Sequence, residues 1–326
     1  MKKILVTGGA GYIGSVVVRE LLKEGHKVRV IDNLIYGGLS LLGFWNEKKF
    51  EFIFGDITNK NDCDRALEGV AIVIHLAAIV GDKACFLNQD LAKKVNLEST
   101  CILADLAKKK SVRRFIFVST CSNYGISDPS KYVTEEDLLK PVSLYAETKV
   151  QAERYILDQK DVIFCPTVLR LATVYGVSPR MRFDLLINEF VRDALKKHKL
   201  VVYGKQFWRP YIHVKDVAGA IKEIIRSPES ITKGEIYNVG DTSQNFQKKM
   251  IAEMIKNRLP RTNLEYIKKE EDPRSYKVSF EKIKNGLGFK TTKTVKDGIN
   301  EIIQVLSQNV INDFNTKKYT NSLKLS

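Results

Sequence analysis

A strand that runs directly into a glycine-rich turn is the feature that most constrains the fold of this chain. The apolar residues 4–7 are followed by Gly-Gly-Ala-Gly-Tyr-Ile-Gly at 8–14. Two overlapping spacings fit this turn, Gly9-x-Gly11-x-x-Gly14 and the set Gly8, Gly11 and Gly14. Glycines there permit a tight turn, a close approach of backbone to a pyrophosphate, and a helix packed against the strand. The turn alone is weak evidence, because packing by itself also produces glycine-rich strand–helix connections.

A second expected strand strengthens the interpretation of the glycine turn as a dinucleotide site. Residues 27–32 are typical of a strand and end in Asp32, 18 residues after Gly14. A carboxylate at this place accepts hydrogen bonds from an adenosine ribose and repels a 2′-phosphate. The two segments together predict a site for NAD rather than NADP, with the pyrophosphate at the N-terminus of the helix that follows Gly14.

Strand-like and helix-like segments alternate through the first half of the chain. The expected strands are 4–7, 27–32, 50–54, 71–76, 114–119 and 163–169, and helical patterns include 15–24, 62–67, 92–109 and 144–158. This rhythm predicts an α/β fold with a doubly wound parallel (Rossmann) sheet covered by helices on both faces. Ligands bind such sheets at the carboxyl ends of the strands, where the strand order reverses.

The rhythm changes after Gly176. We expect an NAD-binding Rossmann domain over residues 1–175, with returning segments near 211–240, and a smaller interleaved α/β substrate-binding domain over 176–326. The polar stretch from about 309 to 326 is weakly patterned, so we expect a frayed tail.

Composition narrows the functional class. No apolar run approaches the roughly 20 residues of a membrane span. The five cysteines are scattered and odd in number, and neither they nor the four histidines have metal-ligand spacing; we therefore expect a reduced, cytoplasmic protein without a metal. The net charge of +15 fits either a nucleic-acid-binding protein or a lysine-rich surface with some charge focused on an anionic substrate. Because no aromatic-rich binding motif accompanies the basic clusters, we favour the second interpretation and expect no nucleic-acid partner.

Two segments carry the groups for catalysis. Tyr145 and Lys149 lie four residues apart on one face of an expected helix. A neighbouring cation favours the phenolate and lowers the pKa of the tyrosine, which then takes a proton from a carbinol as hydride leaves the same carbon. The strand 115–119 leads into Thr120, whose hydroxyl would face the same cleft. Alone, either segment is an ordinary helix or a hydroxyl-rich turn; together, after a dinucleotide turn, they indicate an enzyme.

With these residues the chain resembles the extended short-chain dehydrogenase/reductases of the NAD-dependent epimerase/dehydratase family, which act on nucleotide sugars. The matching segments run from Thr7 to about Phe289 and comprise 7–14, Gly55-Asp56, His75-Leu-Ala-Ala78, Asn96, Ser119-Thr120 with Tyr124-Gly125, Tyr145 with Lys149, Leu169-Arg170 with Val174-Tyr175-Gly176, and Arg209-Pro-Tyr-Ile-His-Val214 with Asp216.

The resemblance implies a role for each matching residue. Tyr145 is the catalytic acid/base, Lys149 lowers its pKa and holds the nicotinamide ribose, and Thr120 polarises the sugar oxygen. The cofactor-binding residues it implies are Gly8, Gly11, Tyr12, Ile13, Gly14, Asp32, Asn33, Asp56, Ile57, Ala77, Asn96, Tyr145 and Lys149. The substrate-binding residues are Thr173, Asn188, Arg209 and Arg274. The two arginines match those that hold the sugar-nucleotide diphosphate. Thr173 stands where the family often has asparagine, so we expect Asn188 to take up part of that role. Arg180 and Arg182 are further candidates, unless they form interdomain salt bridges.

Departures from the family pattern narrow the reaction. Dehydratases of the family carry an Asp-Glu pair directly after the catalytic threonine, and decarboxylases place glutamate at the second of these positions. This chain has Cys121 and Ser122 there. We therefore expect C4 epimerisation of a nucleotide sugar through a 4-keto intermediate.

Other possibilities stay open. The stretch 169–188 is similar to that of enzymes tailoring deoxysugars or heptoses, which keeps a 4-dehydrogenase/4-ketoreductase as the alternative. A non-catalytic NAD-binding sensor or scaffold is the alternative from another class. Cys85 or Cys121 is either an additional acid/base or a packed thiol. The helices at 92–109 and 144–158 are the family's usual dimer-forming pair, with Val150, Ile156 and Leu157 as apolar residues on the second, so we expect a homodimer.

Overall fold

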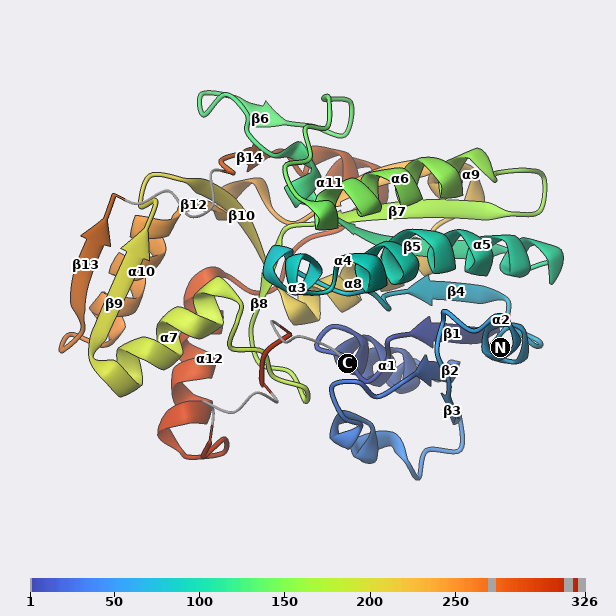
Figure 1. Cartoon of the computed structure of the whole chain (residues 1–326), viewed down its shortest axis with the longest axis horizontal. Coiled ribbons are helices and arrows are strands. Elements are labelled where there is room, and N and C mark those ends of the chain that lie inside the picture. Colours follow the sequence, from blue (N-terminus) through green and yellow to red (C-terminus); the bar gives the residue numbers. More distant parts are fainter. Residues whose placement is uncertain (1, 269–273, 314–318, 322–326) are drawn as a thin grey trace.

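A seven-stranded parallel sheet forms the centre of the structure, a computed structural model that describes residues 2–268, 274–313 and 319–321 (Figure 1). Its strands are β1 (Lys3–Thr7), β2 (Lys27–Asp32), β3 (Phe50–Phe54), β4 (Ile72–His75), β5 (Arg114–Thr120), β7 (Cys165–Leu171) and β11 (Glu235–Val239). Their order is β3-β2-β1-β4-β5-β7-β11, and every neighbouring pair is parallel. The predicted strands and the predicted doubly wound sheet are therefore confirmed.

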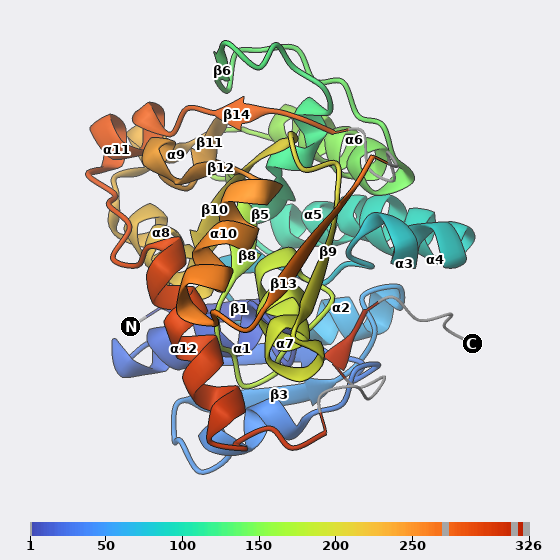
Figure 2. The same cartoon turned by 90° about the vertical axis from the view of Figure 1, so that its left-hand side faces the viewer.

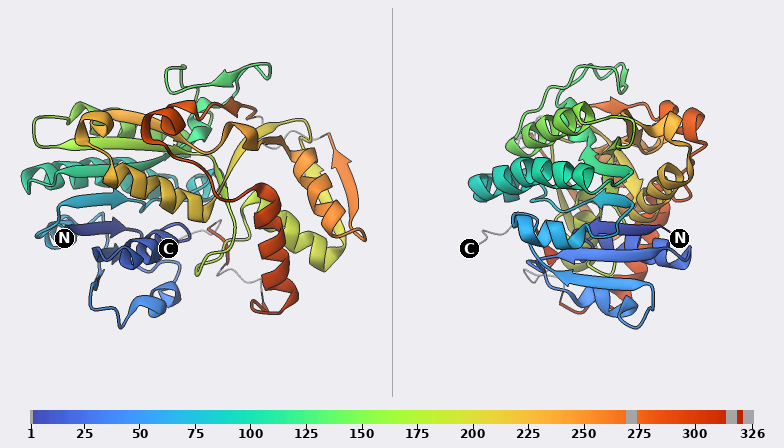
Figure 3. Two further views of the ribbon diagram at one scale, coloured as in Figure 1. Left: turned by 180° about the vertical axis from the view of Figure 1, so that it is seen from behind. Right: turned by 90° about the vertical axis from the view of Figure 1, so that its right-hand side faces the viewer.

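Helices cover both faces of this sheet. They are α1 (Gly14–Lys23), α2 (Lys60–Ala66), α3 (Asp82–Leu87), α4 (Gln89–Lys93), α5 (Ser99–Lys109), α6 (Leu144–Asp158), α8 (Val214–Arg226), α9 (Glu229–Thr232) and α11 (Glu281–Leu287). Along β1 the side chains alternate: Ile4 and Val6 pack in one core with α1 and α8, while Leu5 packs in a second core with α2, α5 and α6. In Figure 1, α5 and α6 lie on the near side of the sheet, and the rear view in Figure 3 shows α8 on the other side.

The sheet is built from nearly continuous apolar runs because its central strands are buried on both faces. All four residues of β4 and all seven of β7 are buried, whereas the edge strand β3 has exposed and half-buried positions. Strand order runs in one direction from β1 to β3 and in the other from β4 to β11. The reversal between β1 and β4 leaves space for a ligand at the carboxyl ends of these strands.

Smaller sheets and three helices gather beyond that edge. A three-stranded sheet contains β8 (Thr173–Tyr175), β10 (Trp208–His213) and β12 (Asn245–Gln247), and two-stranded sheets pair β9 (Lys199–Tyr203) with β13 (Asn263–Ile267) and β6 (Tyr132–Val133) with β14 (Lys277–Val278). The helices are α7 (Leu186–Lys197), α10 (Lys248–Arg258) and α12 (Val295–Ser307). Figure 2 shows β9 and β13 side by side in this group.

Residues 211–240 contribute both to the large parallel sheet and to the smaller sheets. Its strand β11 pairs with β7 in the large sheet, whereas β10 pairs with β8 and β12. Among the described residues, no helix is long and apolar enough to cross a membrane.

The end of the chain corrects one expectation. We expected a frayed tail from 309, yet residues 319–321 pack against the segment 180–184: Phe183 N donates to Tyr319 O at 2.8 Å, and the two rings lie 5.6 Å apart. Asn321 N donates to the Asp184 carboxylate at 3.0 Å. Residues 314–318 and 322–326 of that stretch lie outside the described residues.

The glycine turn has no room for side chains where it meets the sheet and α1. Gly8 has φ +71°, and a Cβ there would lie 2.8 Å from Ala77 N. A Cβ on Gly14, the first residue of α1, would collide with the Gly8 carbonyl oxygen. This close approach sets the start of α1 directly over the end of β1.

We therefore predict that Gly14→Ala lowers the free energy of unfolding by about 1–3 kcal/mol, because the turn must shift to accept a methyl group. Gly286→Ala is the matched control: it lies inside α11, a Cβ added there would have no described atom within 4 Å, and alanine favours a helix. Denaturant unfolding of both variants tests this, and equal stabilities of Gly14→Ala and the wild type would contradict it.

Candidate active site

A cavity of about 650 Å³ lies at the carboxyl edge of the large sheet. It is lined by the glycine turn, by residues in or directly after the strands β2, β3, β4, β5 and β7, and by residues of the second half of the chain. Most of the predicted site residues line it, namely Gly8, Gly11, Tyr12, Ile13, Gly14, Asp32, Asn33, Asp56, Ile57, Ala77, Thr120, Tyr145, Lys149, Thr173, Arg209 and Arg274. Asn96 and Asn188 do not line it.

The cofactor side is organised around two carboxylates. Asp32, at the end of β2, accepts hydrogen bonds from Ala10 N at 3.0 Å and Leu34 N at 2.9 Å. Burial raises the pKa of Asp32, and these two hydrogen bonds oppose the shift. Asn33 Nδ2 donates to the Asp56 carboxylate at 2.8 Å, so the ends of β2 and β3 are tied together. This geometry, with the glycine cradle, fits an adenosine ribose and a pyrophosphate on the turn.

Tyr12, which lines the cavity, and the two asparagines, which do not, form hydrogen bonds that hold the cavity wall together. The Tyr12 hydroxyl donates to Gly176 O at 2.7 Å and accepts from Asn188 Nδ2 at 3.3 Å, so the phenol joins the glycine turn to the second half of the chain. Asn96 is fully buried and forms two hydrogen bonds with the backbone of Ile79, a lining residue. Asn188 likewise bonds to backbone groups of Gly176 and Arg182. Both amides therefore support residues around the cavity, and their direct contact with a ligand stays a prediction.

Tyr145 and Lys149 lie on one side of α6 and face the cavity together. Ser143 accepts a hydrogen bond from Ala146 N at 3.4 Å and so caps the helix just before the tyrosine. Lys149 Nζ donates to Val118 O at 2.9 Å and lies 4.4 Å from the centre of the Phe117 ring. The helix is thereby fixed to β5, which ends in Thr120.

The pKa values differ from what the sequence suggested. Burial raises the pKa of Tyr145, against the lowering effect of the Arg182 and Arg274 charges. Burial also lowers the pKa of Lys149 to about 8, although the Glu153 carboxylate opposes the shift. The expected lowering of the Tyr145 pKa by Lys149 is not produced by the chain alone, because the phenol is desolvated and the ammonium group is bound to a β5 carbonyl.

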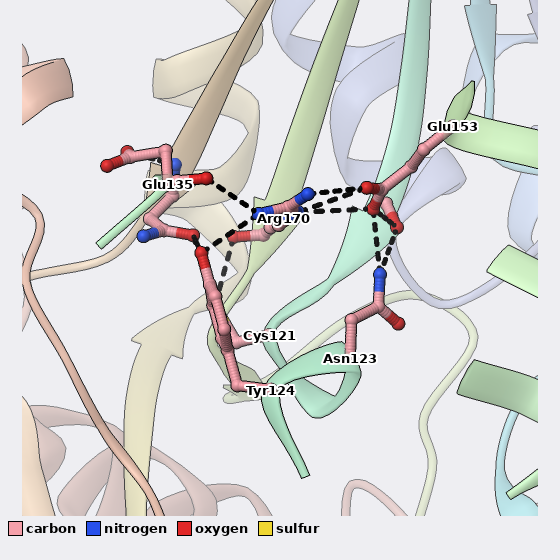
Figure 4. Close-up of polar contacts among 8 residues, drawn as sticks. Cys121, Asn123, Tyr124, Glu135, Glu153 and Arg170 are labelled. Carbon is pink, nitrogen blue, oxygen red and sulfur yellow. Dashed lines mark hydrogen bonds and ion pairs between the residues drawn. The ribbon is translucent and has the colours of Figure 1, made fainter. Parts of the chain in front are cut away.

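A buried polar cluster joins α6 to β7 and to the segment that follows β5 (Figure 4). Arg170 on β7 pairs with Glu153 on α6 at 2.8 Å, and both side chains are at most 4 % exposed. Glu153 also accepts from Asn123 Nδ2 at 2.8 Å and from the Ser119 hydroxyl. Arg170 donates to the Tyr124 hydroxyl at 3.1 Å. The residues on both sides of Thr120 are thus bonded to the helix that carries Tyr145 and Lys149.

Sequence reasoning missed Glu153 and gave Arg170 no role. Residues 145, 149 and 153 follow one another at intervals of four, which places Glu153 on the same stripe of α6 as Tyr145 and Lys149. A charged residue on the buried stripe of a helix was the available signal, since it requires a buried partner.

The two candidate thiols do not line the cavity. Cys85 Sγ donates to Ile79 O at 3.3 Å and Cys121 Sγ to Arg170 O at 3.2 Å, and both residues are at most 1 % exposed. Burial raises the pKa of Cys85 to about 12 and that of Cys121 well above its usual value. The geometry favours packed thiols over additional acid/base groups.

The substrate side holds two arginines. Arg209 donates to Trp208 O at 2.8 Å and to the Arg274 carbonyl, and its guanidinium lies 5.2 Å from the Tyr276 ring centre. Arg274 pairs with Asp82 at 2.6 Å. Thr173 lines the cavity at the start of β8. Two guanidinium groups here are suited to an anionic ligand.

Comparison with known proteins identifies the family. The model of the NAD dependent epimerase/dehydratase family matches residues 4–240. The chain belongs to this family. It is an NAD-dependent enzyme that modifies nucleotide sugars.

Several relatives span nearly the whole chain. The uncharacterized UDP-glucose epimerase YtcB of Bacillus subtilis is 32% identical over 318 residues, which cover 94% of this chain and 98% of the relative. The dTDP-glucose 4,6-dehydratase DesIV of Streptomyces venezuelae, solved with NAD bound, has a TM-score of 0.85 at 26% identity over 94% of this chain and 97% of its own. The UDP-glucose 4-epimerase of Thermotoga maritima, solved with UDP-glucose, has a TM-score of 0.84 at 25% identity over 94% and 99%. Epimerases and dehydratases are therefore both among the relatives.

The lowered pKa of Lys149 predicts a pH-dependent stability. Between pH 8 and about 10.5 the unfolded chain holds a proton on Lys149 that the folded protein has lost, so stability rises with pH in this window. The wild type should gain on the order of 2 kcal/mol relative to Lys149→Met between pH 7 and pH 10. Urea unfolding of the two proteins at a series of pH values measures the difference. If the difference in unfolding free energy between the two proteins does not change with pH, the lowered pKa of Lys149 is wrong.

We also predict that Glu153→Gln destabilises the protein by about 3–5 kcal/mol, because it leaves the Arg170 charge buried without its counter-ion. The double variant Glu153→Leu/Arg170→Met removes both charges and should recover part of this loss. Denaturant unfolding of the single and double variants forms the test. The pair would be shown to be energetically unimportant if Glu153→Gln unfolded at the wild-type midpoint.

Proposed function

We propose that this enzyme is an NAD-dependent nucleotide-sugar epimerase, which removes hydride from sugar C4 and returns it through a 4-keto intermediate. The observation that carries the proposal is the set of groups on the cavity wall. Thr120, Ser122, Tyr145 and Lys149 line it, while position 121 is a buried cysteine. These groups suffice for moving a proton to and from a hydroxyl, the only acid/base step that epimerisation needs.

The carboxylates of the cavity are already engaged. Asp32 and Asp56 belong to the cofactor side, Asp82 pairs with Arg274, and both oxygens of Asp184 accept from Arg182 at 2.9 Å. An elimination of water requires a further acid and base close to the sugar. The absence of a carboxylate at positions 121 and 122 therefore supports epimerisation over dehydration.

Each catalytic residue has a defined task in this proposal. Tyr145 exchanges a proton with the C4 oxygen, and Thr120 donates a hydrogen bond to the same oxygen. Because burial raises the pKa of Tyr145, the phenol is a proton donor in the protein alone. Bound NAD supplies the hydride acceptor and a positive charge. Lys149, held by Val118 O, places a second positive charge on the phenol side of the cavity.

Arg209 and Arg274 are the proposed ligands of the substrate diphosphate. Both line the cavity, and guanidinium groups pair with phosphates through two parallel hydrogen bonds. Relatives solved with UDP-glucose or UDP-glucuronic acid support this class of ligand.

A 4-dehydrogenase or 4-ketoreductase is the second candidate. It is favoured by the segment 169–188, from which Arg180, Arg182 and Asp184 line the cavity with charged groups. It uses the same proton and hydride steps in one direction only, so the fate of the cofactor distinguishes it from an epimerase.

The homodimer remains a prediction. Of the three apolar residues that we named on the second helix of the pair, Val150 and Ile156 are 5 % and 0 % exposed within the single chain, so they are not available to a partner. Leu157 is partly buried and packs against the core of the same chain. Ile102 on α5 is 41 % exposed and is an apolar residue that this pair of helices offers.

We predict that Tyr145→Phe lowers kcat by about 10²–10⁴-fold, because the proton-transfer group is lost. NAD binding should persist, since the phenol is one contact among many. Turnover is measured with UDP-, GDP-, CDP- and dTDP-sugars, and NAD binding by calorimetry. Unchanged turnover would reject Tyr145 as the acid/base.

Product analysis on the same panel tests the reaction. A C4 epimer formed without net NADH supports the epimerase. Stoichiometric NADH, or a requirement for it, identifies the one-way oxidoreductase, and a 4-keto-6-deoxy sugar identifies a dehydratase.

A further inference from the structure

A buried guanidinium on the cofactor side of the cavity has hydrogen-bonding capacity that the protein leaves unused. Arg180 lines the cavity and is 7 % exposed, and its Nε has no hydrogen-bond partner among the described residues. Its guanidinium carbon lies 4.5 Å from the centre of the Tyr36 ring. The Tyr36 hydroxyl, which belongs to the same cavity lining, is likewise buried without a partner in the described part of the chain. Unsatisfied buried donors of this kind indicate a missing ligand group.

The charge of Arg180 is also unmatched. Arg182, two residues on, forms a two-bond ion pair with Asp184. Arg180 forms no ion pair with any described residue, and its guanidinium donates a 3.5 Å hydrogen bond to Thr320 O. A buried cation of this kind is costly unless an anion joins it.

The position of Arg180 identifies the anion. Ser178, two residues earlier, donates to Tyr12 O at 2.7 Å and lies 3.2 Å from the Ser15 hydroxyl, at the beginning of α1. Tyr36 follows Asp32 by four residues, and the Arg180 charge acts on the Asp32 carboxylate. Arg180 therefore lies beside the glycine turn, whereas Arg274 is held by Asp82 at the start of α3.

The glycine turn itself supplies no cation. Residues 8–15 contain no basic side chain, so the turn offers a pyrophosphate only backbone N–H groups and the partial charge of α1. A pyrophosphate brings two negative charges into a partly desolvated cavity. A guanidinium that donates two parallel hydrogen bonds provides the matching charge and geometry.

We propose that Arg180, with the Tyr36 hydroxyl, binds the pyrophosphate of NAD from the second half of the chain. The arginines of the cavity then divide between two ligands: Arg180 serves the cofactor, and Arg209 and Arg274 serve the substrate diphosphate. The second half of this division rests on the proposed function, whereas the assignment of Arg180 rests only on NAD binding.

The end of the chain holds this site in place. Thr320 O accepts from Arg180, and Asn321 lines the cavity and donates its N–H to Asp184. The Phe183 and Tyr319 rings pack edge to face. These contacts screen Arg180 from solvent and keep its side chain beside Tyr36.

Binding titrations on the full chain, stripped of cofactor, test the proposal. Arg180→Gln should weaken NAD and ADP-ribose binding by roughly 10- to 100-fold, the range for hydrogen bonds to a charged group. Binding of adenosine, which has no pyrophosphate, and of UDP and dTDP should be unchanged. Arg274→Gln is the matched control and should weaken UDP or dTDP while leaving NAD unchanged.

Other outcomes overturn the proposal. If Arg180→Gln weakens UDP or dTDP and spares NAD, Arg180 binds the substrate diphosphate. If Arg180→Gln weakens adenosine binding as much as NAD binding, the substitution disturbs the cavity wall itself. If NAD binding is unchanged, Arg180 is only a packing partner of Tyr36. Tyr36→Phe, with an expected several-fold loss for NAD and none for adenosine, is the measurement to use if Arg180→Gln does not fold. No turnover enters these titrations, so failure of the C4 proposal leaves their outcome unaffected.

Discussion

The ion pair between Glu153 and Arg170 is the interaction on which the geometry of the active site depends. It joins α6, which carries Tyr145 and Lys149, to β7, and the hydrogen bonds of Glu153 to Ser119 and Asn123 extend it to both sides of Thr120. Taking two charges out of water costs about as much as their attraction returns. The pair therefore fixes the position of α6 on the sheet more than it adds to the free energy of unfolding, because any displacement of α6 along the sheet leaves a charge buried and unpaired.

Burial and charge act differently around Tyr145 and Lys149 than they do around the arginines of the cavity. On the catalytic side, burial disfavours charge, so that the pKa of Tyr145 is raised and that of Lys149 is lowered. On the ligand sides, cations gather where phosphates are expected, with Arg180 beside the glycine turn and Arg209 and Arg274 on the substrate side. Part of the net charge of +15 thus has a local purpose, and the rest is distributed over lysines and arginines elsewhere.

Much of the site could be predicted from the sequence because its residues stand at fixed distances from short-range signals. The glycine turn follows a strand directly, Asp32 ends the next one, and Tyr145 and Lys149 are one helical turn apart. Asn96 and Asn188 show the limit of this reasoning. Asn96 matches the family pattern, and Asn188 is expected to stand in for the asparagine that the family often has at position 173. The direction of each amide, however, depends on backbone groups of Ile79, Gly176 and Arg182 that only folding brings near.

The sequence by itself determined the parallel sheet, the location of the dinucleotide turn and the placement of Tyr145 and Lys149 one turn apart on a helix, because apolar periodicity and glycine spacing act over a few residues. Only the tertiary structure decided what surrounds them. Burial, and not the neighbouring ammonium, dominates the pKa of Tyr145; the thiols of Cys85 and Cys121 point to backbone carbonyls; and residues 319–321 return to brace Arg180. Desolvation and long-range pairing depend on which segments meet, and segments separated by more than a hundred residues, such as 180 and 320, leave no local pattern that would predict their contact.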